Sequence, residues 1–216
     1  MINRKDILKK FSFSNYAPNF NENDLFLLNC HSAGATFVIE TGTGISTHYV
    51  ADGARPTCNM MYSIDLRLPP EVVRIDWVTY LQGWSLVPED LPSSSSSGFK
   101  KSQYRSPEDL VVFGHVDKMD KDLPDDVLRR IIRENPDRHP DFVFSDGGEY
   151  SGYAEWRLLA DQIPIGGIWA AHDIYFPKSV KHWQSTMEIE TSKSWKVLVK
   201  TKSKQGLLIA RRISDG

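Results

Sequence analysis

The chain has 216 residues, with 26 Lys and Arg against 28 Asp and Glu, so its formal net charge is −2. A hydrophobic fraction of 40% and a charged fraction of 25% are typical of a globular protein and exclude wholesale disorder. The near-neutral charge argues against nucleic-acid and membrane partners, because both normally demand a basic excess. The length favours one domain, covering residues 1–216.

The cysteine count and the apolar runs indicate the compartment. Cys30 and Cys58 are the only cysteines, which excludes a disulfide-dense scaffold and a zinc site built on cysteines. A reducing compartment is favoured, with one bridge between the two left open. The sequence has no apolar run long enough to span a membrane, and its first segment has none of signal-peptide length. We therefore predict a cytoplasmic protein.

Strand-like and helix-like patterns alternate along most of the chain. Buried strands are predicted within residues 35–44, 59–66, 77–83, 140–148 and 166–174. Helices are predicted within residues 45–53, 124–135 and 151–163. Two alternating segments at residues 195–202 and 206–213 predict a closing antiparallel hairpin. The alternation predicts an α/β fold with a Rossmann-like, doubly wound, mainly parallel sheet.

Two further segments carry predictions of their own. Five consecutive serines at residues 93–97 cannot bury apolar area, so we predict a lid or acceptor-recognition loop inserted around residues 85–125. A linker between two halves is the alternative, and residues 109–117 are strand-like with no assigned place. The segment "KSVKHWQ", residues 178–184, is interpreted as a solvated helix face.

Acidic and small side chains follow the predicted strands, where open parallel sheets bind their ligands. The turn after the first strand runs from Glu40 to Gly44, and its glycines let a ligand approach the backbone closely. A carboxylate at Glu40 would repel a pyrophosphate but suits an ammonium group. Asp65 ends the next strand, where an acid can accept both ribose hydroxyls. A ribose with an ammonium and no phosphate indicates S-adenosylmethionine.

From about Phe37 to the C-terminus, the sequence resembles the class I S-adenosylmethionine-dependent methyltransferases. The resemblance is carried, in order, by "VIETGTG", "YSIDL", "YLQGWS", "FVFSDGGEYSGYAEW" and "IPIGGIWAAHD". Within that family the chain is most similar to small-molecule O-methyltransferases of the macrocin sugar type and, more distantly, the catechol type. The resemblance implies a seven-stranded sheet whose last strand is antiparallel.

The resemblance also implies a cofactor site. Glu40, Gly42 and Gly44 would line the methionine side of the cofactor, and Asp65 would hold its ribose. Trp84 stands where the family often has an acid that contacts adenine, so stacking on adenine and packing under the serine-rich segment both remain open. The full predicted set is Glu40, Gly42, Thr43, Gly44, Asp65, Trp84, Ser85 and Asp146.

A divalent metal site and a general base are implied next to the cofactor. Asp146 and Asp173 match two of the metal-ligand positions, and His172 takes the place of a neighbouring acid; the set suits Mg²⁺ or Mn²⁺. Ile174 is a departure, because the catechol type has Asn there. The predicted catalytic residues are Glu149 and His172, as rival bases, together with Asp146.

The sequence therefore predicts methyl transfer from S-adenosylmethionine to a hydroxyl of a small molecule, preferably a sugar or glycan, with a divalent metal. The acid-rich pocket favours a hydroxyl-rich acceptor. The alternatives are an inactive cofactor-binding module and a methyltransferase for a phenolic or nucleic-acid acceptor. The oligomeric state is left open, a homodimer being one option.

Overall fold

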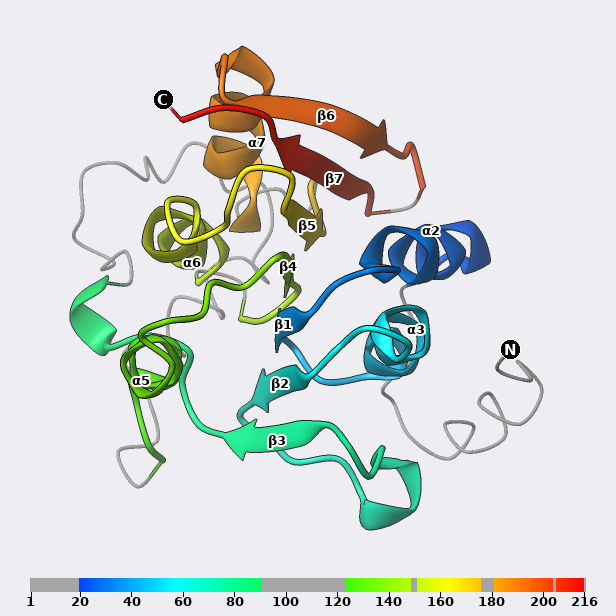
Figure 1. Cartoon of the computed structure of the whole chain (residues 1–216), viewed down its shortest axis with the longest axis vertical. Coiled ribbons are helices and arrows are strands. Elements are labelled where there is room, and N and C mark those ends of the chain that lie inside the picture. The colour runs from blue at the N-terminus through cyan, green and yellow to red at the C-terminus, as the bar shows by residue number, and fades with distance from the viewer. Residues whose placement is uncertain (1–19, 91–122, 149–150, 176–180, 204, 216) are drawn as a thin grey trace, which may run out of the picture.

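The computed structural model describes residues 20–90, 123–148, 151–175, 181–203 and 205–215. Seven strands in these ranges form one sheet with the order β3-β2-β1-β4-β5-β7-β6 (Figure 1). The strands are β1 (Phe37–Thr41), β2 (Met60–Asp65), β3 (Thr79–Gln82), β4 (Phe142–Ser145), β5 (Ile168–His172), β6 (Trp195–Lys200) and β7 (Leu207–Arg212). The sheet confirms the predicted α/β fold.

Helices cover both faces of the sheet, as the alternating pattern predicts. In Figure 1, α2 and α3 lie on one side, and α5, α6 and α7 lie on the other. The helices are α2 (Glu22–Ser32), α3 (Ile45–Ala54), α5 (Val127–Glu134), α6 (Gly152–Leu159) and α7 (Trp183–Thr191). Short 3₁₀ turns add η1 (Glu71–Val73) and η2 (Pro88–Asp90). The sequence analysis did not predict α2, whose first turn is capped by the side chain of Asn21.

Strand directions place the carboxyl ends of the first five strands at one edge of the sheet. β1 pairs in parallel with β2 and β4, β2 with β3, and β4 with β5. β7 is antiparallel to both of its neighbours, β5 and β6. The predicted closing hairpin is therefore present, with β7 inside the sheet and β6 at its edge.

The central strands are buried on both faces, which explains why they read as continuous apolar runs. In β1, Phe37 and Ile39 pack with Trp156 in the cluster under α5 and α6. Val38 points the other way and packs with Leu28 of α2 and with residues of α3. Because Ile39 is fully buried, Ile39→Ala would cost about 2–5 kcal/mol of stability. This rigid core fixes where the strand ends lie.

Several predictions fall on segments outside the described residues. They include the serines at residues 93–97, the strand-like residues 109–117 and most of the loop around residues 85–125. The interpretation of residues 178–184 as a solvated face is wrong for Lys181 and His182, which are both buried, although Trp183 is exposed. His182 packs against the start of α6, where a Cβ on Gly152 would come within 2.4 Å of its ring.

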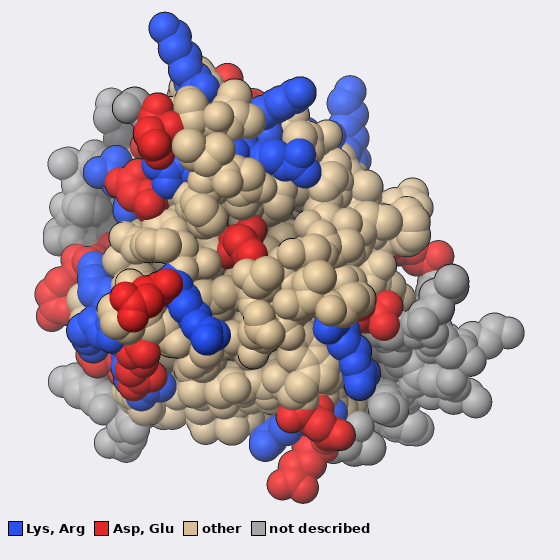
Figure 2. Space-filling view, in the orientation of Figure 1, with Lys and Arg blue, Asp and Glu red and all other residues tan. Residues whose placement is uncertain are grey.

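The surface and the helices both bear on possible partners. On the face shown in Figure 2, basic and acidic side chains are interspersed, and neither sign forms a continuous patch among the described residues. That distribution gives no electrostatic footprint for a nucleic acid on this face. Among the described residues, no helix is both long and apolar enough to cross a bilayer.

Candidate active site

The glycine-rich turn after β1 packs directly against the end of β4. Gly42 has φ +87°, and a Cβ there would lie 2.4 Å from the carbonyl oxygen of Asp146, so any side chain would clash with the backbone. The Gly42 amide donates to Ile64 and the Asp146 amide donates to Thr41. The turn therefore holds the ends of β1, β2 and β4 together, and α3 begins directly after it.

Asp65 lies beside this turn, at the end of β2. One carboxylate oxygen accepts from the backbone amide of Thr43 at 2.9 Å, and the other accepts from the amide of Arg67 at 3.0 Å. Burial raises the pKa of Asp65, although these amides oppose the rise. Each oxygen keeps a further lone pair, so the carboxylate can still accept from hydroxyl groups of a ligand.

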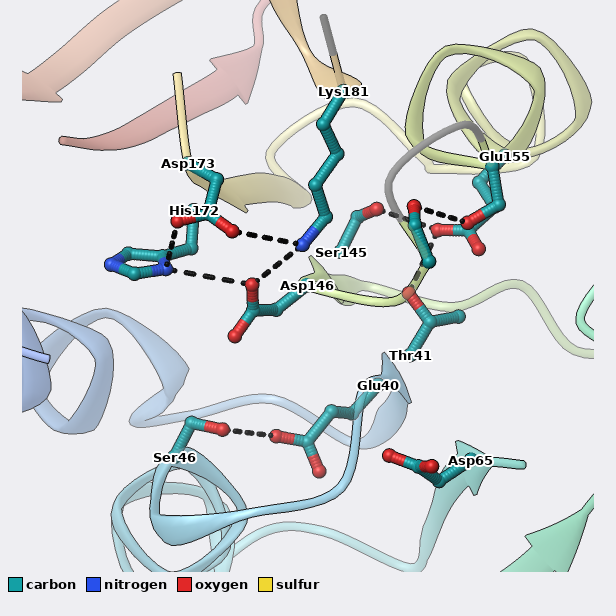
Figure 3. Close-up of polar contacts among 12 residues, drawn as sticks. Glu40, Thr41, Ser46, Asp65, Ser145, Asp146, Glu155, His172, Asp173 and Lys181 are labelled. Carbon is teal, nitrogen blue, oxygen red and sulfur yellow. Dashed lines mark hydrogen bonds and ion pairs between the residues drawn. The ribbon is translucent and has the colours of Figure 1, made fainter. Parts of the chain in front are cut away.

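Glu40 is fully buried and links the turn to β2. Its carboxylate oxygens accept from the hydroxyls of Ser46 at 2.9 Å and Ser63 at 2.6 Å. Burial raises the pKa of Glu40 to about 7, even though the hydroxyl donors oppose it. In this arrangement Glu40 organises the turn, and its contact with a cofactor ammonium stays a prediction. Figure 3 shows Glu40 and Asp65 on the same side of the site.

Trp84 and Ser85 follow β3 and are held by different partners. The backbone of Trp84 exchanges hydrogen bonds with Pro124 and Val127. Its buried indole N–H has no hydrogen-bond partner among the described residues, and the predicted stacking on adenine is untested. The Ser85 hydroxyl donates at 2.7 Å to Glu155 of α6, so it is engaged by the protein itself.

Glu155 is a buried acid that the sequence analysis missed. Its carboxylate accepts hydrogen bonds from the hydroxyls of Thr41 at 2.7 Å, Ser145 at 2.6 Å and Ser85 at 2.7 Å (Figure 3). These donors follow β3 or end β1 and β4, so one side chain of α6 fixes three strand ends. The signal in the sequence is a hydroxyl residue at each of those ends.

A second cluster lies beyond the ends of β4 and β5, where Asp146, His172 and Asp173 meet Lys181 (Figure 3). The Lys181 ammonium lies 2.7 Å from Asp146 Oδ1 and 3.3 Å from Asp173 Oδ2. His172 Nδ1 lies 3.4 Å from Asp146 Oδ1 and 3.2 Å from Asp173 Oδ1. Two carboxylates thus alternate with two basic groups.

The charges in this cluster support one another. Burial opposes ionisation of Asp146, but Lys181 and His172 together hold its pKa below the usual value. Burial also opposes the imidazolium, yet the two carboxylates outweigh it and raise the pKa of His172 to about 9. At neutral pH, His172 is therefore a proton donor here. It can act as a base only after its contacts with the two carboxylates weaken.

Local backbone and ring contacts fix the cluster. Asp173 has φ +65°, a conformation that Asp tolerates better than most residues but that still costs energy. Its amide donates to Gly206 before β7, which anchors the bend. The His172 ring stacks on Phe20 with centroids 4.0 Å apart. His182 remains neutral, because burial lowers its pKa to about 3.

The predicted metal ligands are brought together as the sequence analysis expected. One ligand atom each from Asp146, His172 and Asp173 lie within 4.8 Å of one another, and two carboxylates with an imidazole are a suitable donor set. The residues therefore fit a divalent ion in type and spacing. The feature that sequence reasoning missed is Lys181, whose ammonium already contacts both carboxylates. Glu149, the rival base, lies outside the described residues.

The comparisons with known proteins identify the fold. No family model and no curated protein matches the sequence. Cofactor-bound Rv0187 from MTB matches with a TM-score of 0.60 and 13% identity, covering 98% of this chain and 88% of that chain. The O-methyltransferase from Bacillus cereus in complex with SAH matches with a TM-score of 0.58 and 14% identity, covering 96% and 89%.

A third solved structure is larger than this chain. The methyltransferase MycE from the mycinamycin biosynthetic pathway, in complex with Mg, SAH and mycinamycin VI, matches with a TM-score of 0.52 and 12% identity. The match covers 96% of this chain and 54% of MycE. The fold of the chain is that of the class I S-adenosylmethionine-dependent methyltransferases. The resemblance drawn from the sequence motifs is thereby confirmed at the level of the fold, with O-methyltransferases among the structures that share it.

Proposed function

We propose that the chain is an S-adenosylmethionine-dependent O-methyltransferase that acts on a hydroxyl of a small molecule. The observation that carries the proposal is Asp65, a carboxylate at the end of β2 beside the Gly42–Gly44 turn of a methyltransferase fold. Its remaining lone pairs suit a ribose, and the turn leaves backbone close to that position. In the proposal, Trp84 takes the adenine.

The proposed division of labour follows the two sides of the site. Bound S-adenosylmethionine supplies a methyl group on a positively charged sulfur. The chain aligns the acceptor hydroxyl with that methyl group and removes the hydroxyl proton. The cluster of Asp146, His172 and Asp173 lies beside the turn, because the Asp146 carbonyl packs on Gly42. We place the acceptor hydroxyl there, with its proton received by Glu149, or by His172 once the contacts of its ring with the two carboxylates have weakened.

A divalent ion at this cluster is part of the proposal. MycE was solved with Mg, and Asp146, His172 and Asp173 offer ligand atoms close enough for one ion. Such an ion would lower the pKa of a bound hydroxyl. A sugar hydroxyl needs this help more than a phenol, and the acidic cluster suits a hydroxyl-rich acceptor, so a glycan is the preferred acceptor and a phenol the alternative.

The remaining alternatives differ in what they predict. An inactive binding module would hold the cofactor without turnover, and the engaged Ser85 and Glu40 side chains are compatible with it. A nucleic-acid acceptor is disfavoured by the net charge of −2. The single domain of residues 1–216, the loop around residues 85–125, the cytoplasmic location and a homodimer stay predictions.

Calorimetry with S-adenosylmethionine tests the first step, with and without Mg²⁺ or Mn²⁺. The proposal expects binding that tightens when a glycan acceptor is added. Transfer of a labelled methyl group to a panel of glycans and phenols then tests turnover, and a chelator should reduce the rate reversibly. Absence of binding at millimolar cofactor would overturn the nucleoside site, and binding without transfer to any acceptor would favour the inactive module.

A further inference from the structure

Lys181 is a buried lysine at the centre of the second cluster. Its side chain is 2% exposed, and a lysine is almost never fully buried unless it is paired. Its ammonium contacts Asp146, which ends β4, and Asp173, which follows β5. The lysine itself directly precedes His182 and α7. Three separate parts of the chain therefore meet through one cation.

The same two carboxylates are the oxygen donors of the proposed metal site. An ion bound to Asp146 and Asp173 would share those carboxylates with the Lys181 ammonium. The ion and the ammonium would then share two ligands in a buried site, and two positive charges so close together repel each other strongly there. Both carboxylates already contact the Lys181 ammonium, so a further cation gains little from them while that ammonium stays in place. Metal entry therefore requires the ammonium to leave.

We propose that the Lys181 ammonium is a displaceable counter-ion, and that it and a divalent cation are alternative occupants of the Asp146–Asp173 carboxylate pair. Lys181 then sets how tightly the site binds metal. His172 keeps its position whichever of the two cations is bound, because its ring is stacked on Phe20. The inference deepens the proposed function and rests on its cation site. It assigns Lys181 a positioning role in the metal-free state.

The experiment measures metal binding rather than methyl transfer. Binding of Mn²⁺ is followed by the electron paramagnetic resonance signal of the free ion, in the full chain and without cofactor. Lys181→Met removes the competing charge and should bind Mn²⁺ about 10- to 100-fold more tightly than the wild type, because ammonium contacts to two carboxylates no longer oppose the ion. Lys200→Met, which removes an exposed lysine paired with Glu190, should leave the affinity unchanged.

Three results of the binding measurements would overturn the inference. Equal Mn²⁺ affinity of the wild type and Lys181→Met would show that the lysine does not compete. Absence of binding to both would show that the carboxylate pair takes no divalent ion. In the Lys181→Met background, Asp146→Asn should abolish the tight binding, and tight binding that persists there would place the ion elsewhere and overturn the inference as well.

A second variant and a wild-type measurement guard against a loss of folding. Lys181→Gln keeps a polar group of similar length and should show the same direction of change. In the wild type, Mg²⁺ at saturation should shift the nuclear magnetic resonance signals of the Lys181 side chain and leave those of Lys200 unchanged. Unchanged Lys181 signals at saturation would contradict displacement. Failure of the proposed function is seen separately, as absent S-adenosylmethionine binding in calorimetry.

Discussion

The two sides of the site hold their carboxylates in opposite ways. At the ends of β1 and β2, Glu40 and Asp65 accept hydrogen bonds from neutral hydroxyl and amide groups, and burial raises both pKa values. At the ends of β4 and β5, Asp146 and Asp173 contact the side chains of Lys181 and His172. There the cations lower the pKa of Asp146 in spite of its burial.

The difference indicates what each side can exchange. A carboxylate held by amides and hydroxyls can accept further hydroxyl groups, as a ribose would offer, without losing the hydrogen bonds that it already accepts. A carboxylate held by an ammonium can exchange one cation for another. The first side therefore suits a fixed polyol ligand, and the second suits a replaceable ion. The effects of substitutions should therefore depend on pH and cofactor on the first side, and on the cation present on the second side.

The largest effect is expected from removing the cation of the second side. Lys181→Met would leave the buried Asp173 and the partly buried Asp146 without their ammonium and should cost about 3–5 kcal/mol of unfolding free energy in the presence of a chelator. Urea unfolding measures the change. The matched control, Lys200→Met, removes an exposed partner of Glu190 and should cost less than about 1 kcal/mol. Equal effects in the two variants would contradict the burial argument.

A smaller loss of unfolding free energy is expected at Glu155, whose side chain joins the ends of β1 and β4. Glu155→Ala would leave the buried hydroxyls of Thr41 and Ser145, and that of Ser85, without their acceptor. We expect a loss of about 2–4 kcal/mol, since each unsatisfied hydroxyl is costly. Glu155→Gln keeps one acceptor oxygen and should lose less. Urea unfolding checks this order, and a larger loss in Glu155→Gln would show that charge matters more than acceptance.

On the first side, the stability that Glu40 contributes to the fold should depend on pH. Burial raises the pKa of Glu40 to about 7 in the folded chain, from 4.5 for a glutamate in water. A raised pKa stabilises the fold fully below pH 4.5, and this contribution is lost as the pH rises toward 7. Its size is up to about 3 kcal/mol at 1.36 kcal/mol per pH unit.

Glu40→Gln stays neutral and isolates that contribution. The stability of the wild type relative to the variant should fall between pH 4.5 and pH 7, as measured by urea unfolding across that range. His182 titrates in the opposite sense, but it is present in both proteins and cancels in the difference. A difference that does not change with pH would show that Glu40 is ionised in the folded chain.

The smallest effect is expected for cofactor binding. Asp65→Ala should weaken S-adenosylmethionine binding by about 1–3 kcal/mol through loss of charged hydrogen bonds to the ribose. Calorimetry measures this, and Asp76→Ala on the following loop serves as a control with unchanged affinity. The same affinity in wild type and Asp65→Ala would place the ribose elsewhere.

Sequence reasoning predicted the sheet and the gathering of several candidate residues at one edge, because strand ends have a readable signature. An apolar run followed by a polar or small residue locates Gly42, Asp65, Asp146 and Asp173, and parallel strands must place these residues at one edge. The fold and the convergence of Asp146, His172 and Asp173 were accessible in this way. The strands at β1 and β4 were clear because both of their faces are buried.

The missed residues lack such a signature. Lys181 lies in a segment rich in polar residues, and burial of its charge depends on carboxylates that precede it by 35 and by 8 residues. Glu155 reads as an ordinary acid in the first turn of a helix. For α2, the available signal was Asn21 as a capping residue before Leu25 and Leu28 at helical spacing. Tertiary contacts decide the roles of Lys181 and Glu155, whereas α2 carried a local signal.

The place of β7 in the sheet has a consequence for synthesis on the ribosome. β5, which carries His172, pairs with β4 on one side and with β7 on the other. Until residues 207–212 have been translated, β5 is an open edge with buried-type side chains, and such edges recruit other strands. We expect released chains truncated before β7 to aggregate or to bind chaperones, and the full chain to do so less.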